Sequence, residues 1–501
     1  MLVGGLDVGT TGCKLTVYSS DGKFVNNEYV EYDVSRQNGE HEIDASVIWT
    51  AVCTVIKNTY KKHPLLGAVG VTTFGETFVL IDNNDSVLLP SMLYTDPRGE
   101  KETEALNDSL GEERIISIAG VKPHSMYSLP KLMWIKNNLP HIYNKAKRVL
   151  LMEDYIVYML SGKAQIDYSL AARTLGFDIK NKCWSTEIFD ASGIDISLMS
   201  EPVPTGTAAG KIHPSLAEKL GISSEIIIVN GCHDQVAAAV GSGVFEVGDA
   251  VDGTGTVECV TPIFDGIPQS RKLYEEGYSV VPYVFDGTYA CYALSFTGGA
   301  TLKWFRDNFA KYEMEAASEK GTNVYAELDS RVSNKPTDLL ILPHFAGAAN
   351  PYMDTGSRAV MVGLTLEHTA VDIYKALMEG VTYEIMLNIE HLESAGIKLK
   401  RLVATGGGAS SDVWLGIKAD VLNRPVTALD AKEAGACGTC MLTAVAVGAC
   451  KNLEDARQSF VKTKSRFEPC PKRVEIYKKN YEAYKKIYEA VRPIVEEMQN
   501  G

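Results

Sequence analysis

The stretch that decides the fold lies near the start of the chain, where Leu2–Tyr18 reads LVGGLDVGTTGCKLTVY. Its apolar and glycine beginning predicts a buried strand, Asp7–Gly12 predicts a tight turn, and Cys13–Tyr18 predicts a second strand. After a turn at Ser20–Gly22 the extended segment Phe24–Val34 follows. Strands joined by tight glycine-containing turns are typical of an antiparallel meander.

The turn within this stretch has the chemistry of a phosphate site. Glycines let a backbone approach a phosphate closely and point N–H groups at it. Thr10 and Thr11 add neutral donors, and Lys14 adds a positive charge. Asp7, at the end of the predicted strand, can hold Mg²⁺ directly or through its waters. A plain hairpin turn would also account for these residues.

A second candidate lies near the middle of the chain. Ile226–Val229 predicts a strand, and an alanine-rich helix is expected from Gln235 to about Val240. Between them stands Asp234, at a place where functional side chains gather in α/β proteins. A carboxylate there can accept the proton of an attacking hydroxyl group, so Asp234 is a candidate general base. The same aspartate could instead serve as the N-cap of the helix.

Two more glycine-rich turns occur in the second half of the sequence. Asp252–Thr256 echoes Asp7–Gly12, which suggests two related α/β domains that face each other across a cleft, with a boundary near Gly241–Gly248. Thr405–Ser411 lies between an apolar strand and a helical segment, where glycines permit close approach of a flat ring or a phosphate. It could also be an ordinary strand-to-helix turn. Neither has the spacing of a Walker or Rossmann motif.

Composition excludes several classes of function. The 501 residues carry a formal net charge of −14, which argues against non-specific binding to nucleic acid or to an anionic membrane. The uncharged run Ala434–Cys450 is slightly short for a bilayer span and predicts a buried helix. No secretory signal begins the sequence, and the ten cysteines are scattered rather than arranged as a disulfide framework. We therefore expect reduced cysteines and a cytoplasmic location.

Taken together, these segments resemble the FGGY carbohydrate kinase family, within the actin/Hsp70/sugar-kinase superfamily. Two family signatures fit the stretches Met126–Asn138 and Ala359–Glu379. The family's phosphate loop matches Asp7–Gly12, its base motif matches Gly231–Asp234, and its adenosine-side motif matches Gly406–Ala409. The resemblance spans essentially the whole chain.

The resemblance implies an α/β fold of two ribonuclease-H-like (actin-like ATPase) domains facing across a catalytic cleft, with residues 1–243 binding sugar and 244–501 binding nucleotide. It implies ATP and Mg²⁺ as cofactors, Asp234 as the general base and Asp7 as the residue that organises Mg²⁺. A homodimer is the assembly that it suggests. The residues that it places on ATP are Thr10, Thr11, Lys14, Thr254, Gly255, Gly298, Gly299, Gly407 and Gly408.

Substrate choice depends on two further segments and the residue after the base. The residues that the resemblance places on the substrate are Phe74, Gly75, Glu76, Asp96, Arg98 and Gln235. Glycerol kinases resemble this chain at Glu76 and Gln235 but carry arginine in place of Gly75. Xylulose kinases carry Met-His in place of Gly75-Glu76 and usually asparagine in place of Gln235. The small Gly75 should leave room for a longer substrate. We therefore expect phosphorylation of a ketopentose or ketohexose, with a glycerol or other polyol kinase as the alternative.

Two other functions stay open at this stage. The superfamily includes non-catalytic ATP-binding regulatory proteins, although such a protein does not need a base aimed at a second ligand. It also includes acyl-phosphate kinases, whose anionic substrates need cationic side chains; Arg98 and Arg173 are the candidates by motif. Cys232, two residues before the base, predicts partial sensitivity to thiol modification.

Overall fold

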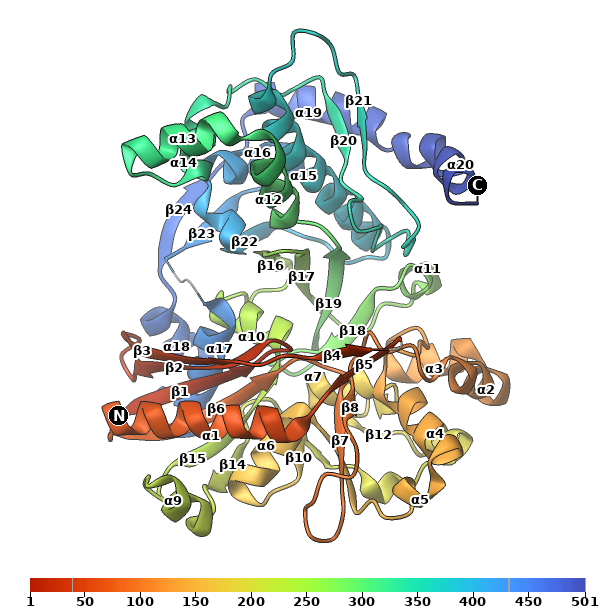
Figure 1. Cartoon of the computed structure of the whole chain (residues 1–501), viewed down its shortest axis with the longest axis vertical. Helices are drawn as coiled ribbons and strands as arrows, with labels where there is room; N and C mark the ends of the chain where they lie inside the picture. The colour runs from red at the N-terminus through yellow and green to blue at the C-terminus, as the bar shows by residue number, and fades with distance from the viewer. Residues whose placement is uncertain (38, 431–432, 501) are drawn as a thin grey trace.

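The computed structural model describes residues 1–37, 39–430 and 433–500, which form two lobes, each built on one mixed β-sheet (Figure 1). In spatial order the first sheet contains β14 (Ala208–Lys211), β15 (Ile227–His233), β6 (Leu66–Thr73), β1 (Leu2–Val8), β2 (Gly12–Ser19) and β3 (Phe24–Glu31). The second contains β18 (Ser279–Pro282), β19 (Thr288–Ser295), β17 (Glu258–Asp265), β16 (Asp249–Thr254), β22 (Arg401–Gly406), β23 (Val426–Leu429) and β24 (Thr463–Phe467).

The two sheets repeat one topology. In the first, β1, β2 and β3 form an antiparallel meander, and β1 then pairs in parallel with β6 and β6 with β15. In the second, β16, β17 and β19 form the meander, and the parallel strands are β22 and β23. An antiparallel strand, β14 or β24, lies beyond the parallel strands in each sheet. The predicted meander and its repetition in the two halves are confirmed.

Helices cover both sheets. Those of the first half are α1 (Ala45–Lys62), α2 (Glu100–Leu110), α3 (Glu112–Ala119), α4 (Ser128–Asn138), α5 (Pro140–Tyr143), α6 (Met152–Ser161), α7 (Tyr168–Ala171), α8 (Thr186–Ser192), α9 (Pro214–Leu220) and α10 (Asp234–Gly241). Those of the second half are α11 (Arg271–Glu275), α12 (Gly299–Phe309), α13 (Lys311–Lys320), α14 (Val324–Arg331), α15 (Ala370–Ser394), α16 (Asp412–Leu422), α17 (Ala434–Ala446), α18 (Leu453–Phe460), α19 (Pro471–Tyr484) and α20 (Ile487–Asn500). Among the described residues, no helix combines the length and the apolar character that crossing a membrane would require.

Short strands complete the lobes. Paired outside the two large sheets are β4 (Ser35–Gln37), β5 (Glu40–Ile43) and β8 (Ser91–Met92); β7 (Phe78–Ile81) and β9 (Arg148–Leu151); β10 (Gln165–Asp167) and β13 (Glu201–Val203); β11 (Phe177–Asp178) and β12 (Cys183–Trp184); and β20 (Leu340–Leu342) and β21 (Val360–Val362).

Strand β1 separates two hydrophobic cores because its side chains alternate between the faces of the sheet. Leu6 and Val8 belong to the core that includes α1 and α6. Val3 belongs to the other core, and Gly5 meets α17, where a Cβ atom on Gly5 would lie 2.5 Å from the carbonyl oxygen of Ala436. The same alternation places Asp7 on the face that carries α17.

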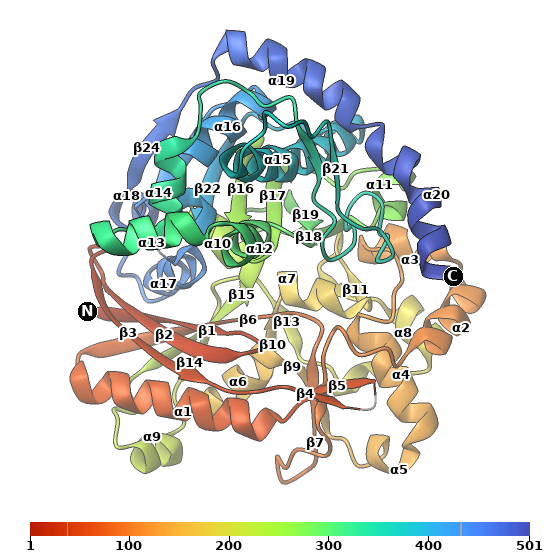
Figure 2. The same cartoon turned by 45° about the horizontal axis from the view of Figure 1, so that its top comes forward.

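Helix α17 joins the end of the chain to the first sheet. Although it begins at Ala434, it packs on β1 and crosses α10, and both views show it beside these elements (Figures 1 and 2). At the crossing, a Cβ atom on Gly241 would overlap the carbonyl oxygen of Ala434, and one on Gly438 would overlap that of Ala237. The two helices therefore meet backbone to backbone. The domain division at 243/244 remains a proposal, and α17 lies beyond it in sequence.

Strand β15 is longer than expected. It was predicted to end at Val229 but continues to His233, since Asn230 pairs with Val71 and, after an irregularity, His233 pairs with Thr73. His233 is therefore the cap residue of α10, and Asp234 is the first residue of the helix. The alternative in which Asp234 is the N-cap is wrong, because its backbone is already helical.

We predict that Gly438→Ala destabilises the protein. An added methyl group has no space between α17 and α10, so the free energy of unfolding should fall by about 1–3 kcal/mol. Gly416, inside α16, is the matched control because a Cβ atom there would meet nothing within 4 Å. Gly416→Ala should stabilise the helix by about 0.5–1 kcal/mol. Denaturant unfolding of both variants tests this packing; equal stability of the two would contradict it.

Candidate active site

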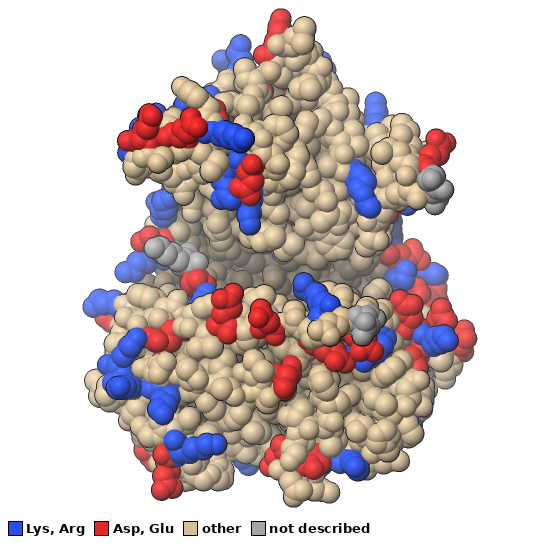
Figure 3. All heavy atoms as spheres, in the orientation of Figure 1, with Lys and Arg blue, Asp and Glu red and all other residues tan. Residues whose placement is uncertain are grey.

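A groove crosses the molecule between the two lobes, and acidic side chains gather along its lower rim in Figure 3. In the first lobe, Asp234 is the first residue of α10, and Asp7 lies near the end of β1. A Cβ atom on Gly435, in the first turn of α17, would lie 4.0 Å from Oδ2 of Asp7 and 4.0 Å from the carbonyl oxygen of Asp234. The crossing of α10 and α17 therefore brings these three elements together.

Both carboxyl groups have raised pKa values. Burial raises the pKa of Asp7 to about 7; the negative charges of Asp234 and Glu433 add to the effect, and Lys14 opposes it. Burial also raises the pKa of Asp234 to about 6, against the lowering effects of the backbone N–H of Gln235 and the charge of Arg173. A carboxyl group with a pKa near neutrality can exchange a proton with a substrate at physiological pH.

The loop after β1 is closed by a hydrogen bond from the N–H of Gly9 to the carbonyl oxygen of Gly12, 2.9 Å long. Thr10 and Thr11 lie within this turn. Lys14, on β2, donates to Oε1 of Glu433 at 2.8 Å. Glu433 precedes α17, so this ion pair links the predicted phosphate loop to the helix that comes from the far end of the chain.

The loop after β6 lies beside the base. The N–H of Phe74 donates to the carbonyl oxygen of Val8 at 3.2 Å, and Nε of Arg173 donates to Oε1 of Glu76 at 2.6 Å. A Cβ atom on Gly75 would lie 3.2 Å from both Arg173 and His233. The expected free space next to Gly75 is therefore already filled by these two side chains, and the argument for a longer substrate from Gly75 alone is wrong.

Asp96 and Arg98 bind each other. The guanidinium group of Arg98 donates to both carboxylate oxygens of Asp96 at 2.8 Å and to Oε1 of Glu42 at 2.6 Å. Burial would raise the pKa of Asp96, but hydrogen bonds from Arg98 and from the N–H of His41 lower it. Lys131 donates to the carbonyl oxygens of Asp96 and Arg98. Contact of this pair with a substrate stays a prediction.

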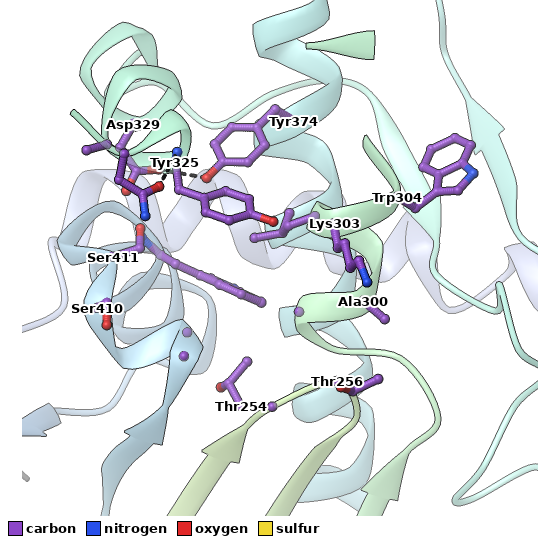
Figure 4. Close-up of a pocket in the computed structure, with 18 of the residues that line it drawn as sticks. Thr254, Thr256, Ala300, Lys303, Trp304, Tyr325, Asp329, Tyr374, Ser410 and Ser411 are labelled. Carbon is purple, nitrogen blue, oxygen red and sulfur yellow. Dashed lines mark hydrogen bonds between the residues drawn. The ribbon is translucent and has the colours of Figure 1, made fainter. Parts of the chain in front are cut away.

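A pocket of about 910 Å³ lies in the second lobe (Figure 4). Five of the residues predicted to bind nucleotide line it: Thr254, Gly255, Gly299, Gly407 and Gly408. Figure 4 shows Thr254 and Thr256 at the strand ends that form one side, with Tyr325 and Tyr374 on the opposite side. The hydroxyl group of Tyr374 donates to Oδ1 of Asp329 at 2.9 Å. Loops distant in the sequence thus form one cavity.

Several glycines near the pocket are required by the fold itself. A Cβ atom on Gly406, which has a φ of +79°, would lie 2.5 Å from the carbonyl oxygen of Thr254, and one on Gly408 would lie 2.5 Å from its Cγ2. At Gly407 the closest atom would be 3.9 Å away. Gly298 donates to the carbonyl oxygen of Thr256, which holds the start of α12 against this loop. Gly407 therefore leaves the most open space for a ligand.

A buried charged cluster supports the pocket, and the sequence analysis missed it. Lys418, on α16, donates to Oδ2 of Asp252 at 2.6 Å, to Oγ1 of Thr254 at 2.7 Å and to Oε1 of Glu258 at 2.5 Å. Burial disfavours its charge, but Asp252 and Glu258 raise the pKa of Lys418 above its usual value. The cluster ties β16, β17 and α16 together beneath Thr254. A lysine within the mainly apolar helical stretch Val413–Leu422 was the available signal.

Two side chains near the base were also missed as members of the site. Arg173 was considered as a binder of anionic substrates, but it lies between the rings of Tyr127 and Tyr292, at 5.1 and 5.5 Å. Tyr292 is on β19, in the second sheet, and its hydroxyl oxygen lies 2.9 Å from Nδ1 of His233. Nothing in the sequence pattern brings Tyr127 and Tyr292 together, so only the fold reveals that their rings flank Arg173.

Two further predictions concern the cysteines and a metal ion. All ten cysteines are free thiols. Cys232 is fully buried and burial raises its pKa, which argues against the expected sensitivity to thiol modification because the thiolate is the reactive form. Within the part of the chain that the structure describes, no group of three or more His, Cys, Asp or Glu side chains could by itself hold a metal ion.

Comparison with known proteins agrees with this geometry. Residues 2–241 match the N-terminal domain of the FGGY family of carbohydrate kinases, and residues 270–447 match the C-terminal domain of that family. A xylulose kinase of Lactococcus lactis is 28% identical over 483 residues, covering 94% of this chain and 93% of the relative. A gluconokinase of Bacillus subtilis is 29% identical over 467 residues, covering 89% and 87%.

A solved structure described as a xyloylose kinase from Brucella ovis superposes with a TM-score of 0.87 at 26% identity, over 99% of this chain and all of that one. The fold and site thus define a two-domain α/β phosphotransferase with an actin-like ATPase fold, as expected. The chain belongs to the FGGY family of carbohydrate kinases. It is accordingly an ATP-dependent kinase that acts on small-molecule sugars.

We predict that Lys418→Met destabilises the protein strongly. The substitution leaves Asp252 and Glu258 buried without a cation, which typically costs about 3–5 kcal/mol. Lys464, an exposed lysine 3.8 Å from Asp412, is the control. Lys464→Met should change the free energy of unfolding by less than about 0.5 kcal/mol. Thermal or denaturant unfolding compares the two variants; similar stabilities would show that the cluster is unimportant.

Proposed function

We propose that this enzyme phosphorylates a hydroxyl group of a neutral ketopentose or ketohexose, with Asp234 as the general base and ATP as the phosphoryl donor. The observation that carries the proposal is the position of Asp234. Its side chain is 42% exposed, although one carboxylate oxygen is enclosed. An aspartate with a pKa of about 6 is largely ionised at neutral pH and can take a proton from an alcohol.

The remaining roles follow from where the loops lie. Thr254, Gly255 and Gly407 line the pocket proposed for the nucleotide. Thr10, Thr11 and Lys14, on the loop after β1, would bind the phosphates from the other side of the cleft, with Gly298, Gly299 and Gly408 shaping the nucleotide side. Phosphoryl transfer needs positioning and charge stabilisation more than covalent chemistry, so binding of ATP from both lobes suits the reaction.

Asp7 is the residue that would bind Mg²⁺. Its carboxylate faces Asp234 and Glu433, and a divalent cation would relieve this accumulation of negative charge. Mg²⁺ is usually held by one or two carboxylates together with phosphate oxygens and water, so a dedicated cluster of protein ligands is not needed. When bound, the ion would neutralise the phosphate charge that increases during transfer.

Substrate class is inferred from the relatives and from Arg173. The similar proteins include xylulose kinases and gluconokinases. Gluconate is an anion, and its recognition would benefit from an unpaired cation, whereas Arg173 is already paired with Glu76. This favours a neutral sugar. Phe74, Gly75, Glu76 and Gln235 would contact the sugar in the proposed site, and Asp96 with Arg98 would hold the adjoining loop.

A coupled assay of ADP release tests this function. Wild-type protein and Asp234→Ala should be compared on ketopentoses, ketohexoses, glycerol, tetritols, pentitols and gluconate. We expect turnover with one ketose class, reduced by at least about a hundredfold in Asp234→Ala because the base is lost. ATP binding should persist, since Asp234 does not line the 910 Å³ pocket.

Glu112→Ala, which removes an acidic first residue of another helix, should leave turnover unchanged. Turnover with glycerol alone would favour the polyol kinase alternative. ATP binding without turnover of any compound in the panel would instead support a non-catalytic regulatory protein.

The pH profile gives a second test. Because the base must be deprotonated, and burial raises the pKa of Asp234 to about 6, kcat/KM should decrease as the pH falls through about 6. In Asp234→Asn the residual activity should lose this acid limb. An acid limb near the ordinary aspartate pKa of about 4, or one that survives in Asp234→Asn, would assign it to another group.

A further inference from the structure

Oδ1 of Asp234 is in an unusual situation for an ionised oxygen. It is shielded from solvent and accepts no hydrogen bond of good geometry from the described residues. Nε2 of His233 lies 3.3 Å from it. A buried carboxylate oxygen without a donor is costly, so the proton state of this imidazole nitrogen affects the base directly.

The other nitrogen of the ring meets a residue from the second sheet. Nδ1 of His233 lies 2.9 Å from the hydroxyl group of Tyr292, and the two rings pack at a centroid distance of 5.2 Å. The backbone of His233 is held separately, by a 2.9 Å hydrogen bond from its N–H to Oγ of Ser169. Both side-chain contacts of the ring are therefore fixed in position.

The ring is neutral in this environment. Burial and the positive charge of Arg173 lower the pKa of His233 to about 3, although Glu76 acts in the opposite direction. A neutral imidazole carries one N–H. If Nδ1 carried it, the lone pair of Nε2 would face the carboxylate, which is unfavourable; if Nε2 carries it, Nδ1 can accept from Tyr292 and the N–H of Nε2 faces the carboxylate at 3.3 Å.

We propose that Tyr292 and His233 form a hydrogen-bond relay that positions the base: the Tyr292 O–H donates to Nδ1 of His233, and the Nε2–H of His233 donates to Oδ1 of Asp234. The other carboxylate oxygen is then left for the substrate hydroxyl. His233 and Tyr292 are positioning residues. Because Tyr292 belongs to β19, the relay exists only when the two lobes are in this arrangement. The kinetic consequences rest on the proposed function; the tautomer does not.

Other groups also act on Asp234, and the test must separate their effects from the relay. Arg173, in the turn after α7, lowers the pKa of Asp234. The charge of Asp234 in turn raises the pKa values of the groups that face it, which are Asp7 on β1, Tyr292 on β19, Cys259 on β17, Cys232 on β15 and Tyr94 in the loop after β8. Tyr292→Phe retains the ring that packs on His233 and Arg173 and removes only the hydroxyl group. Its effect therefore reports on the hydrogen bond.

Kinetics provide the first readout. Without the tyrosine hydroxyl, the Nε2–H tautomer is no longer favoured, the carboxylate loses a donor, and its pKa rises. Tyr292→Phe should move the acid limb of kcat/KM to higher pH by roughly one unit and lower kcat about tenfold at neutral pH, with the KM for ATP unchanged. Tyr289→Phe is the control, because that hydroxyl group is on the same strand and bonds to Ile179 instead. It should leave the profile unchanged.

His233→Gln tests the order of the relay. A glutamine side chain at 233 can donate to Asp234 without help from Tyr292. Adding Tyr292→Phe to His233→Gln should therefore have less than about a twofold further effect, in contrast to its effect in the wild type. Equal effects of Tyr292→Phe in both backgrounds, or no effect in either, would overturn the relay.

A measurement that needs no turnover completes the test. In protein labelled with ¹⁵N-histidine, proton–nitrogen correlation spectra report which ring nitrogen carries the proton, and the signal missing in His233→Gln identifies His233. We expect the Nε2–H tautomer in the wild type and a mixture in Tyr292→Phe. An Nδ1–H tautomer in the wild type would overturn the proposal even if no substrate had been found. The correct tautomer without any sugar turnover would leave the relay standing and contradict the proposed function.

Discussion

Gly241 and Gly438 let α10 and α17 cross with their backbones in contact, and the geometry of the cleft depends on this crossing. Asp234 is the first residue of α10, while Glu433 directly precedes α17 and binds Lys14. Gly5, on β1, admits α17 to the sheet that ends near Asp7. A larger side chain at any of these glycines would push apart elements that each carry a charged group of the site.

The two lobes use one topology for different purposes. In the first sheet, the end of the central strand carries Asp7, whose carboxyl group lies near Gly435 of α17 and near Asp234. In the second, the corresponding strand carries Asp252 into a buried cluster, where Lys418 balances its charge and holds Thr254. The carboxylate at one strand end is the one that we propose to bind Mg²⁺, whereas the carboxylate at the other holds Lys418 against Thr254 in the pocket wall. The two sheets therefore share a topology, but their corresponding strand ends take part in different interactions.

Local pattern was sufficient to predict much of this molecule. The glycine turns, the meander, the helix at α10 and the grouping of Thr254 with Gly407 were all predictable, because each depends on spacing along the chain or on a motif. What could not be predicted were contacts between distant segments. Arg173 fills the space beside Gly75, and Tyr292 meets His233, because two lobes and three loops converge there; neither neighbour has a short-range signal in the sequence.

The position of α17 also has a consequence for synthesis. The first sheet and α10, which ends at Gly241, leave the ribosome well before Ala434 does. Synthesis proceeds at about 5–20 residues per second, so the face of β1 that carries Val3 and Gly5 stays uncovered for on the order of ten to forty seconds before α17 is made. During that interval the nascent chain exposes an apolar sheet surface, so the first lobe completes its core only when nearly the whole polypeptide has been made.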